Sequence, residues 1–208
     1  MTTIKGVIFD CDGVMFESRQ ANLAYYNDIL AFFDVDPVTE DEKEKADLCH
    51  TAASSEVLTN LLGQDRLTQA LDIAASIDYR KFIPCMTPEP GLYEVLESLS
   101  AELPLAVATN RGYSMPEILE HFELTKFFTA VVTSRDVEKP KPHPDMLFLA
   151  VEKLGIDIEN LLFVGDSIYD QAAAESAGVP FVAYKTAIAA ETRMESHHQL
   201  LDYVMCGV

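Results

Sequence analysis

Short apolar runs alternate with helical stripes through the second half of the chain, and this alternation constrains the fold more than any other feature. The runs cover residues 105–108, 130–133, 161–164 and 181–183, and apolar residues at helical spacing mark the segments between them. Alternating strands and helices form a parallel sheet with helices on both faces. The chain is therefore predicted to be an α/β protein with a Rossmann-like parallel sheet as its core.

An earlier apolar strand, Val7-Ile8-Phe9, ends in two carboxylates one residue apart. Asp10, Cys11, Asp12 and Gly13 follow it directly. Open α/β sheets bind their ligands at the carboxyl ends of the strands, where these side chains should emerge. Two unpaired carboxylates are costly to bury side by side, so we expect a cation next to them.

The segment between residues 18 and 83 has helical stripes and no strand signal. It ends at a proline-rich linker over residues 84–91. We predict that residues 1–17 and 84–208 form the α/β core domain and that residues 18–83 form an inserted α-helical cap domain. Because the insertion follows the strand that carries Asp10, it is placed to cover the site.

The composition limits the kinds of partner that the chain can bind. A formal net charge of −19 on 208 residues argues against nucleic acid and against an anionic membrane, since both require basic surface. The four cysteines are scattered without a C-x-x-C pair, which favours a reducing cytoplasm. No signal peptide and no membrane-spanning run is evident. We expect a small-molecule partner; no pattern indicates an oligomeric state.

Two further strands end in loops that suit a phosphate. Thr109, Asn110 and Arg111 follow the run 105–108, and a hydroxyl, an amide and free backbone N–H groups there can hold an oxyanion. The alternative is an ordinary turn. Lys141 lies between two prolines, which stiffen the backbone and aim one ammonium group. The alternative for this loop is a solvated helix start.

The run 161–164 ends in Gly165-Asp166-Ser167, with Asp170 four residues after Asp166. That spacing can direct both carboxylates to one point, and hard oxygen ligands suit Mg²⁺. The alternative is that Asp166 or Ser167 caps the following helix. Together the four loops indicate phosphoryl transfer, in which one carboxylate attacks phosphorus and a second carries the proton.

The residues quoted above resemble the four motifs of the haloacid dehalogenase superfamily, in the same order and at strand ends. The helical insertion resembles the small cap of phosphoglycolate phosphatases and β-phosphoglucomutases. The resemblance implies that Asp10 is the nucleophile that forms an aspartyl-phosphate. It implies that Asp12 is the general acid and base, and that its backbone carbonyl coordinates Mg²⁺.

The resemblance also implies that Thr109 and Asn110 bind the phosphoryl oxygens. Lys141 would pair with Asp10 and the phosphate. The metal-binding residues would then be Asp10, Asp12 and Asp166. Asp170 would be either a further ligand or a residue that contacts the ligands. The chain departs from many relatives at Glu17-Ser18, where they carry Asp-Ser, and this position belongs to the hinge.

Physical chemistry adds two expectations about the acids. Mg²⁺ and Lys141 should lower the pKa of Asp10, which must be ionised to attack. Asp12 needs the opposite, a pKa raised towards a proton that it can lend.

Within the superfamily, we predict a Mg²⁺-dependent phosphatase acting on a small phosphate monoester. Asp12 argues against haloacid dehalogenation, which needs no acid for a leaving alcohol. The main rival is a β-phosphoglucomutase-like phosphomutase, and a non-catalytic binding module is a more remote one. Candidate specificity residues are His50 and Thr51, in a predicted loop between cap helices, and Arg111, which could reach a substrate anion or lie on the surface.

Overall fold

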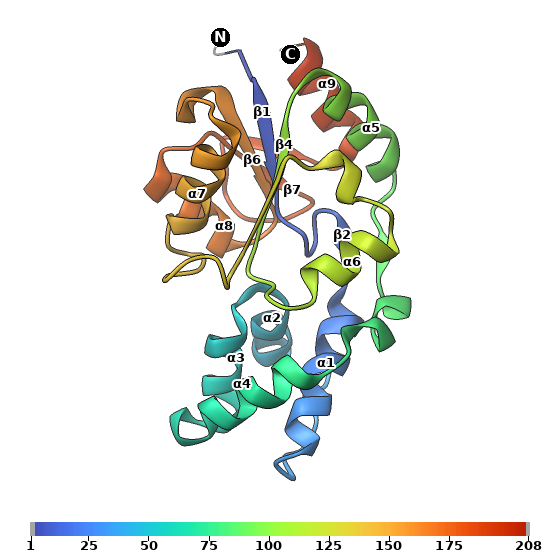
Figure 1. Ribbon diagram of the computed structural model, residues 1–208, viewed down its shortest axis with the longest axis vertical. Coiled ribbons are helices and arrows are strands. Elements are labelled where there is room, and N and C mark those ends of the chain that lie inside the picture. Colours follow the sequence, from blue (N-terminus) through green and yellow to red (C-terminus); the bar gives the residue numbers. More distant parts are fainter. Residues whose placement is uncertain (1–2, 207–208) are drawn as a thin grey trace.

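The computed structural model describes residues 3–206, which form a sheet domain and a smaller helical domain below it (Figure 1). The sheet has six strands in the order β5-β4-β1-β6-β7-β8, and every neighbouring pair is parallel. The strands are β1 (Gly6–Phe9), β4 (Leu105–Thr109), β5 (Ala130–Thr133), β6 (Leu161–Gly165), β7 (Phe181–Tyr184) and β8 (Thr192–Met194). The predicted α/β class with a Rossmann-like parallel sheet is confirmed.

Helices cover both faces of this sheet (Figure 1). They are α5 (Leu92–Glu102), α6 (Met115–His121), α7 (Asp145–Leu154), α8 (Ile168–Ala177) and α9 (His197–Cys206). Strand side chains alternate between the two faces. Val7 and Phe9 pack with α5, α6 and α9, whereas Ile8 packs with α7 and α8. The two apolar layers explain why the strands are continuous hydrophobic runs rather than alternating ones.

The segment after β1 leaves the sheet and forms four helices with a core of their own. These are α1 (Arg19–Ala31), α2 (Lys43–Thr51), α3 (Ser54–Leu62) and α4 (Leu67–Ser76). Ile29, Leu30, Val57 and Leu58 are buried at their centre. A short antiparallel ribbon, β2 (Phe16–Glu17) and β3 (Thr87–Pro88), lies where the chain leaves and returns. The division at residues 18 and 83 remains a prediction.

One local expectation was wrong. Residues 49–51 belong to the end of α2 rather than to a loop, and Ala52 and Ala53 alone separate that helix from α3. The side chain of Ser114, at the start of α6, makes no capping hydrogen bond. Its hydroxyl instead accepts a hydrogen bond from Arg111. The tail of the chain adds the edge strand β8 and the helix α9.

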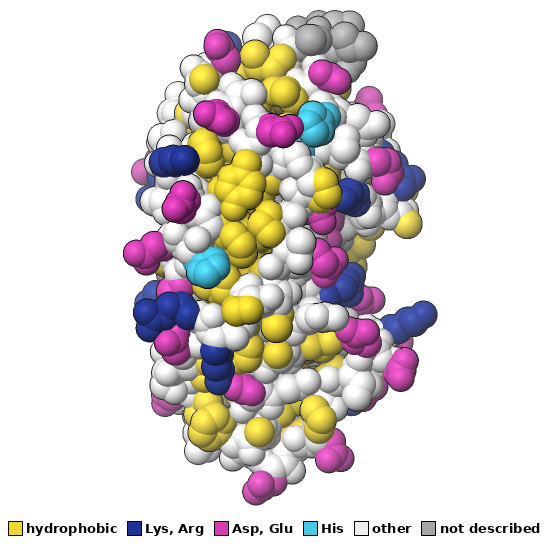
Figure 2. Space-filling model, turned by 90° about the vertical axis from the view of Figure 1, so that its right-hand side faces the viewer, with side chains coloured by type: hydrophobic (Ala, Val, Ile, Leu, Met, Phe, Trp, Pro, Cys, Tyr) yellow, Lys and Arg dark blue, Asp and Glu magenta, His cyan; other side chains and the backbone are white. Residues whose placement is uncertain are grey.

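The acidic side chains are spread over the surface. Figure 2 shows them scattered around a band of hydrophobic side chains on one face of the molecule. No helix within the described residues is both long enough and apolar enough to span a membrane.

Candidate active site

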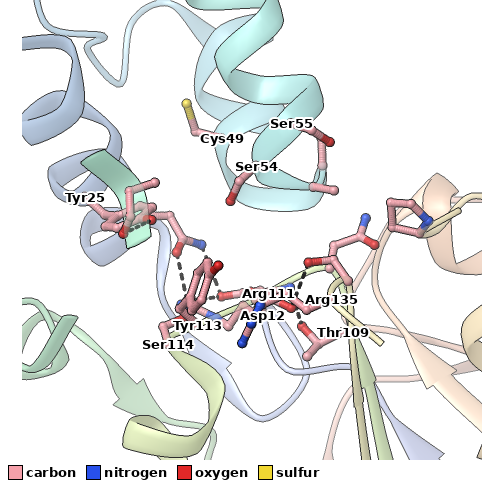
Figure 3. Close-up of a pocket in the computed structure, with 18 of the residues that line it drawn as sticks. Asp12, Tyr25, Cys49, Ser54, Ser55, Thr109, Arg111, Tyr113, Ser114 and Arg135 are labelled. Atoms are coloured by element: carbon pink, nitrogen blue, oxygen red, sulfur yellow. Dashed lines mark hydrogen bonds and ion pairs between the residues drawn. The ribbon is translucent and has the colours of Figure 1, made fainter. Parts of the chain in front are cut away.

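The four polar loops meet at the carboxyl edge of the sheet, where the sheet domain faces the helical domain (Figure 1). Three of them, the loops after β1, β4 and β5, line a cavity of about 360 Å³ together with the helical domain. The wall from the sheet domain includes Asp10, Asp12, Thr109, Arg111 and Lys141, and the opposite wall comes from α1, α2, α3 and α4. Figure 3 shows this arrangement, with Cys49, Ser54 and Ser55 above and Asp12, Thr109 and Arg111 below. At this site Arg135 stacks on the ring of Tyr113, 3.8 Å from its centroid.

Lys141 is the centre of a buried charge cluster. Its Nζ lies 2.8 Å from Oδ1 of Asp10, 2.5 Å from Oδ1 of Asp170 and 2.9 Å from the Ala108 carbonyl oxygen. The three acceptors use all three ammonium protons. A buried lysine would otherwise be strongly destabilising, and losing one member of such an ion pair typically costs about 3–5 kcal/mol. The structure therefore brings together the lysine loop and the loops after β1 and β6.

Asp170 has a second task besides pairing with Lys141. Its Oδ2 accepts hydrogen bonds from the backbone N–H and the hydroxyl of Ser167, and the Ser167 hydroxyl accepts one from the Asp170 N–H. This reciprocal pair is a capping box at the start of α8. Ser167, rather than Asp166, is thus the capping residue, and Asp166 is left for another role.

Three carboxylates are arranged to hold a hard cation. Asp10, Asp166 and Asp170 each offer an oxygen, and these atoms all lie within 4.8 Å of one another. Burial raises the pKa of Asp166 well above its ordinary value, and the charges of Asp170 and Asp10 raise it further. Such crowding of negative charge fits a bound cation, and an all-oxygen donor set fits Mg²⁺.

Gly13 is required for Asp166 to approach. It has φ of +73°, and a Cβ there would lie 2.0 Å from Oδ2 of Asp166. Only glycine satisfies both the backbone angle and the close contact. The Asp12–Gly13 segment is therefore packed directly against the cluster of three carboxylates.

The pKa of Asp10 differs from the expectation. Burial raises it, the charges of Asp170 and Asp12 add to the rise, and Lys141 offsets them only in part, so that it reaches about 7. The expected lowering included a cation, which would act in the same direction as Lys141. The protein alone does not achieve it, because burial and the neighbouring acids together outweigh one lysine.

Asp12 also behaves differently from the expectation. Its Oδ1 lies 2.5 Å from Nη2 of Arg111 and 3.1 Å from Nδ2 of Asn22, and it accepts a hydrogen bond from the Ser18 hydroxyl. Burial raises the pKa of Asp12, but Arg111, His50 and these hydrogen bonds outweigh burial and lower it. The predicted rise is wrong for this arrangement, because the sequence did not indicate that Arg111 would be its partner.

Arg111 is buried, with 8% of its surface exposed, so the surface alternative is wrong. Besides Asp12, its Nη2 donates to Oδ1 of Asn22 at 2.8 Å. Its guanidinium carbon lies 5.1 Å from the centroid of the Tyr79 ring. Within the described residues, its Nε has no hydrogen-bond partner. Arg111 thus connects the loop after β4 to the cap.

The predicted phosphate-binding pair lies at the cavity, but its side chains already have partners. The Thr109 hydroxyl oxygen accepts the Arg111 N–H at 3.1 Å. The Asn110 side-chain nitrogen donates to the carbonyls of Thr51, at 3.0 Å, and Lys141, at 3.1 Å. Asn110 therefore joins the cap to the lysine loop, and the roles of both residues in binding phosphate remain predictions.

The cap candidates His50 and Thr51 lie at the cavity as well. Nδ1 of His50 is 3.2 Å from Nδ2 of Asn22, which is a donor, so Nδ1 accepts. Burial lowers the pKa of His50. The Thr51 hydroxyl donates to the Asp47 carbonyl within α2, at 2.9 Å, so Thr51 meets the core through its own carbonyl.

Sequence reasoning missed Asn22, Ser18 and Tyr79. Asn22 bonds to Asp12, Arg111 and His50, and the Tyr79 hydroxyl donates to Asn22 at 3.3 Å. One signal was available for Asn22. It precedes Leu23 and lies four residues before Tyr26, on the apolar stripe of α1, where a polar residue needs a buried partner.

Comparison with known proteins agrees with this geometry. The model of the haloacid dehalogenase-like hydrolase family matches residues 7–184. A phosphoglycolate phosphatase of Salmonella typhi is 31% identical over 208 aligned positions, covering 88% of this chain and 81% of that protein. The phosphoglycolate phosphatase of Escherichia coli K12 is 41% identical over 95 residues. That alignment covers 45% of this chain and 38% of the Escherichia coli protein.

A solved structure extends the likeness to the whole fold. A HAD-superfamily hydrolase of subfamily IA, variant 1, from Geobacter sulfurreducens is 42% identical, with a TM-score of 0.84. The superposition covers 96% of this chain and 99% of that one. The resemblance seen in the four motifs is confirmed, and the chain belongs to the haloacid dehalogenase-like hydrolase family.

Proposed function

We propose that this protein is a Mg²⁺-dependent phosphatase that hydrolyses a small phosphate monoester through an aspartyl-phosphate on Asp10. One observation carries the proposal. Asp10, its buried partner Lys141 and Asp12 all line the cavity, and Asp10 also belongs to a cluster of three carboxylates. A phosphoryl group in this cavity would meet a nucleophile, positive charge and an acid.

The nucleophile is Asp10. The Lys141 ammonium on its Oδ1 neutralises the cluster and can contact a transferring phosphoryl oxygen. Thr109, Asn110 and Lys141 bind the phosphoryl oxygens, with the Asn110 contribution made by its backbone because its side-chain nitrogen serves the cap.

Asp12 protonates the leaving alcohol and later removes a proton from the attacking water. In the arrangement described, Oδ1 of Asp12 is occupied by Arg111, Asn22 and Ser18. The leaving oxygen must therefore reach Oδ2 or displace Arg111. Arg111 is thereby the residue that decides when the acid is available.

Asp10, Asp166 and the Asp12 backbone would hold Mg²⁺, with Asp170 next to them. When bound, the ion would supply charge neutralisation at the phosphoryl oxygens. The side-chain oxygens of Asp170 already serve Lys141 and Ser167, so Asp170 fits a supporting position better than a direct one.

The names of the relatives support a phosphatase over a phosphomutase, and so does the cap. A mutase needs cap cations for a second phosphate. The cap residues at the cavity include His50, whose pKa is lowered, and Asp72, but no lysine or arginine. A related enzyme that cleaves phosphonates would need a cap lysine as an amine at the site. The two candidates, Lys43 and Lys45, are exposed and do not line this cavity.

The substrate that we propose is a small ester of the phosphoglycolate type, in line with the relatives' names. A cavity of about 360 Å³ suits a molecule of that size. We also propose a cytoplasmic location, which the free thiols of Cys11, Cys49 and Cys85 support.

The test is phosphate release by the purified chain from p-nitrophenyl phosphate and from a panel of small monoesters that includes phosphoglycolate. We expect turnover that requires Mg²⁺ and stops on chelation. Folded protein without turnover on any ester would favour the binding module. Incubation with glucose 1-phosphate and a bisphosphate activator tests the mutase, which would yield an isomer without free phosphate.

A further inference from the structure

The tail helix α9 lies beyond residues 7–184, the segment that matches the family, yet it reaches the loop that carries Asp12. Figure 1 shows α9 next to α5, with which it is in contact. His197, the first residue of α9, is completely buried. Its Nε2 lies 2.8 Å from the carbonyl oxygen of Val14. Two residues separated by most of the chain are thus joined next to the site.

The direction of this bond follows from its partners. A carbonyl oxygen only accepts, so Nε2 carries the proton and donates it. Burial lowers the pKa of His197 to about 4, so the ring is neutral at neutral pH. The ring is held by Tyr184, at 4.8 Å between centroids, and by Phe9, at 6.4 Å. Its orientation is therefore fixed by packing as well as by the hydrogen bond.

Val14 belongs to a tight loop, residues 11–16, that contains Asp12. The Cys11 carbonyl accepts the N–H groups of Met15 and Phe16, and the Phe16 carbonyl accepts that of Gly13. The Met15 carbonyl accepts the N–H of Glu89. Within residues 3–206, His197 is the one donor that reaches the Val14 carbonyl. An unsatisfied buried carbonyl is costly, so this bond matters to the loop.

The opposite side of the loop is fixed by Asp166. Gly13 packs against that carboxylate so closely that no side chain fits. Gly13 is therefore held between Asp12 on one side and Val14, with its bond to His197, on the other. A shift at Val14 would pass through one residue to the backbone of Asp12.

We propose that His197 is a positioning residue, which holds the Asp12 loop through the Val14 carbonyl so that the acid can reach the leaving group. The inference depends on the proposed function, in which Asp12 protonates a leaving alcohol. His197 does not contact substrate. A small displacement of a reacting group can cost a large factor in rate, so loss of the bond should be visible in catalysis.

The experiment compares two leaving groups. Propyl phosphate releases an alkoxide that needs a proton, whereas p-nitrophenyl phosphate releases a stable phenolate that does not. His197→Phe keeps a ring against Tyr184 but removes the donor. We expect kcat for propyl phosphate to fall by about tenfold and kcat for p-nitrophenyl phosphate by less than about threefold. His197→Gln, which places an amide donor near the position of Nε2, should restore most of the difference.

The matched control is His198→Gln, one residue along the same helix. His198 is exposed and pairs with Glu94, so the ratio of the two rates should be unchanged. Equal losses on both substrates in His197→Phe would show a structural role only and overturn the proposal. Wild-type protein that hydrolyses neither ester would instead overturn the proposed function.

Hydrogen exchange of the wild type tests the proposal without a variant, should His197→Phe fail to fold. If His197 holds the loop, the Gly13 and Met15 amides should lose protection whenever α9 opens. We expect their protection factors to be no higher than those of the first bonded amides of α9. Loop amides that stay protected while α9 exchanges freely would overturn the proposal.

Discussion

The two acids of the site differ in what surrounds them. Asp10 lies in a cluster built entirely from the sheet domain, with Lys141, Asp170 and the Ala108 carbonyl. Asp12 lies in a cluster that crosses between domains, since Asn22 and His50 come from the cap. The phosphate side is thus preformed, whereas the environment of the acid depends on where the cap lies.

Asp10→Asn should have the largest effect. It removes the attacking oxygen charge while keeping shape and the loop, so we expect turnover to fall by at least about a thousandfold with the fold intact. Phosphate release and circular dichroism measure the two parts. Asp202→Asn, on the exposed side of α9, is the control. An active Asp10→Asn enzyme would contradict the nucleophile assignment.

Lys141→Met tests how much the Asp10 cluster contributes to stability and turnover. It leaves Asp10 and Asp170 buried without their cation, which should lower the free energy of unfolding by about 3–5 kcal/mol. Turnover should fall by about a hundredfold or more. Urea unfolding and steady-state kinetics measure these changes, and exposed Lys139→Met should show neither. A stable, active Lys141→Met protein would refute the cluster's importance.

Arg111→Met tests the cluster that crosses the domains. The guanidinium lowers the pKa of Asp12 against burial, so its removal should raise that pKa. Asp12 then stays protonated to higher pH. In the pH profile of kcat/KM for propyl phosphate, the descending limb should therefore shift to higher pH. Arg66→Met, outside the cavity, is the control. An unmoved limb would mean that Asp12 is not the titrating acid.

The tail should make stability depend on pH in the acid range. His197 has a pKa of about 4 in the folded protein and an ordinary value near 6.5 when unfolded. Between these values the unfolded chain binds more protons, so stability is full above about pH 6.5 and falls as the pH approaches 4. The wild type should lose about 3 kcal/mol relative to His197→Gln over this range, measured by urea unfolding. A difference that does not change with pH would contradict the burial of a neutral ring.

The smallest effect should come from a single contact between cap and core. The Tyr169 hydroxyl donates to Oε1 of Glu56 at 2.7 Å, at a half-buried position. Tyr169→Phe should weaken cap closure by about 0.5–1.5 kcal/mol, which raises KM by roughly twofold to tenfold. Glu56→Gln, which can still accept the bond, should change KM less. An unchanged KM in Tyr169→Phe would show that this hydrogen bond does not hold the cap.

The contrast between the clusters also explains what the sequence could predict. The members of the first cluster lie in segments that follow strands of one parallel sheet, so topology alone places them together; they are Asp10, Lys141, Asp166 and Asp170. The same reasoning could not find the partner of Asp12. Arg111 turns towards the cap only because Asn22 and Tyr79 face it, and this depends on how four helices pack on the sheet. The predicted direction of the pKa shift of Asp12 was wrong for the same reason.

The start of α8 and the charge balance of the site share one side chain. One oxygen of Asp170 closes the capping box with Ser167, and the other pairs with Lys141. A substitution at this position would damage helix formation and the neutralisation of Lys141 in a single step. Natural variation at position 170 should therefore be tolerated less than at a residue that serves catalysis alone. Any substitution there would impair folding and chemistry together.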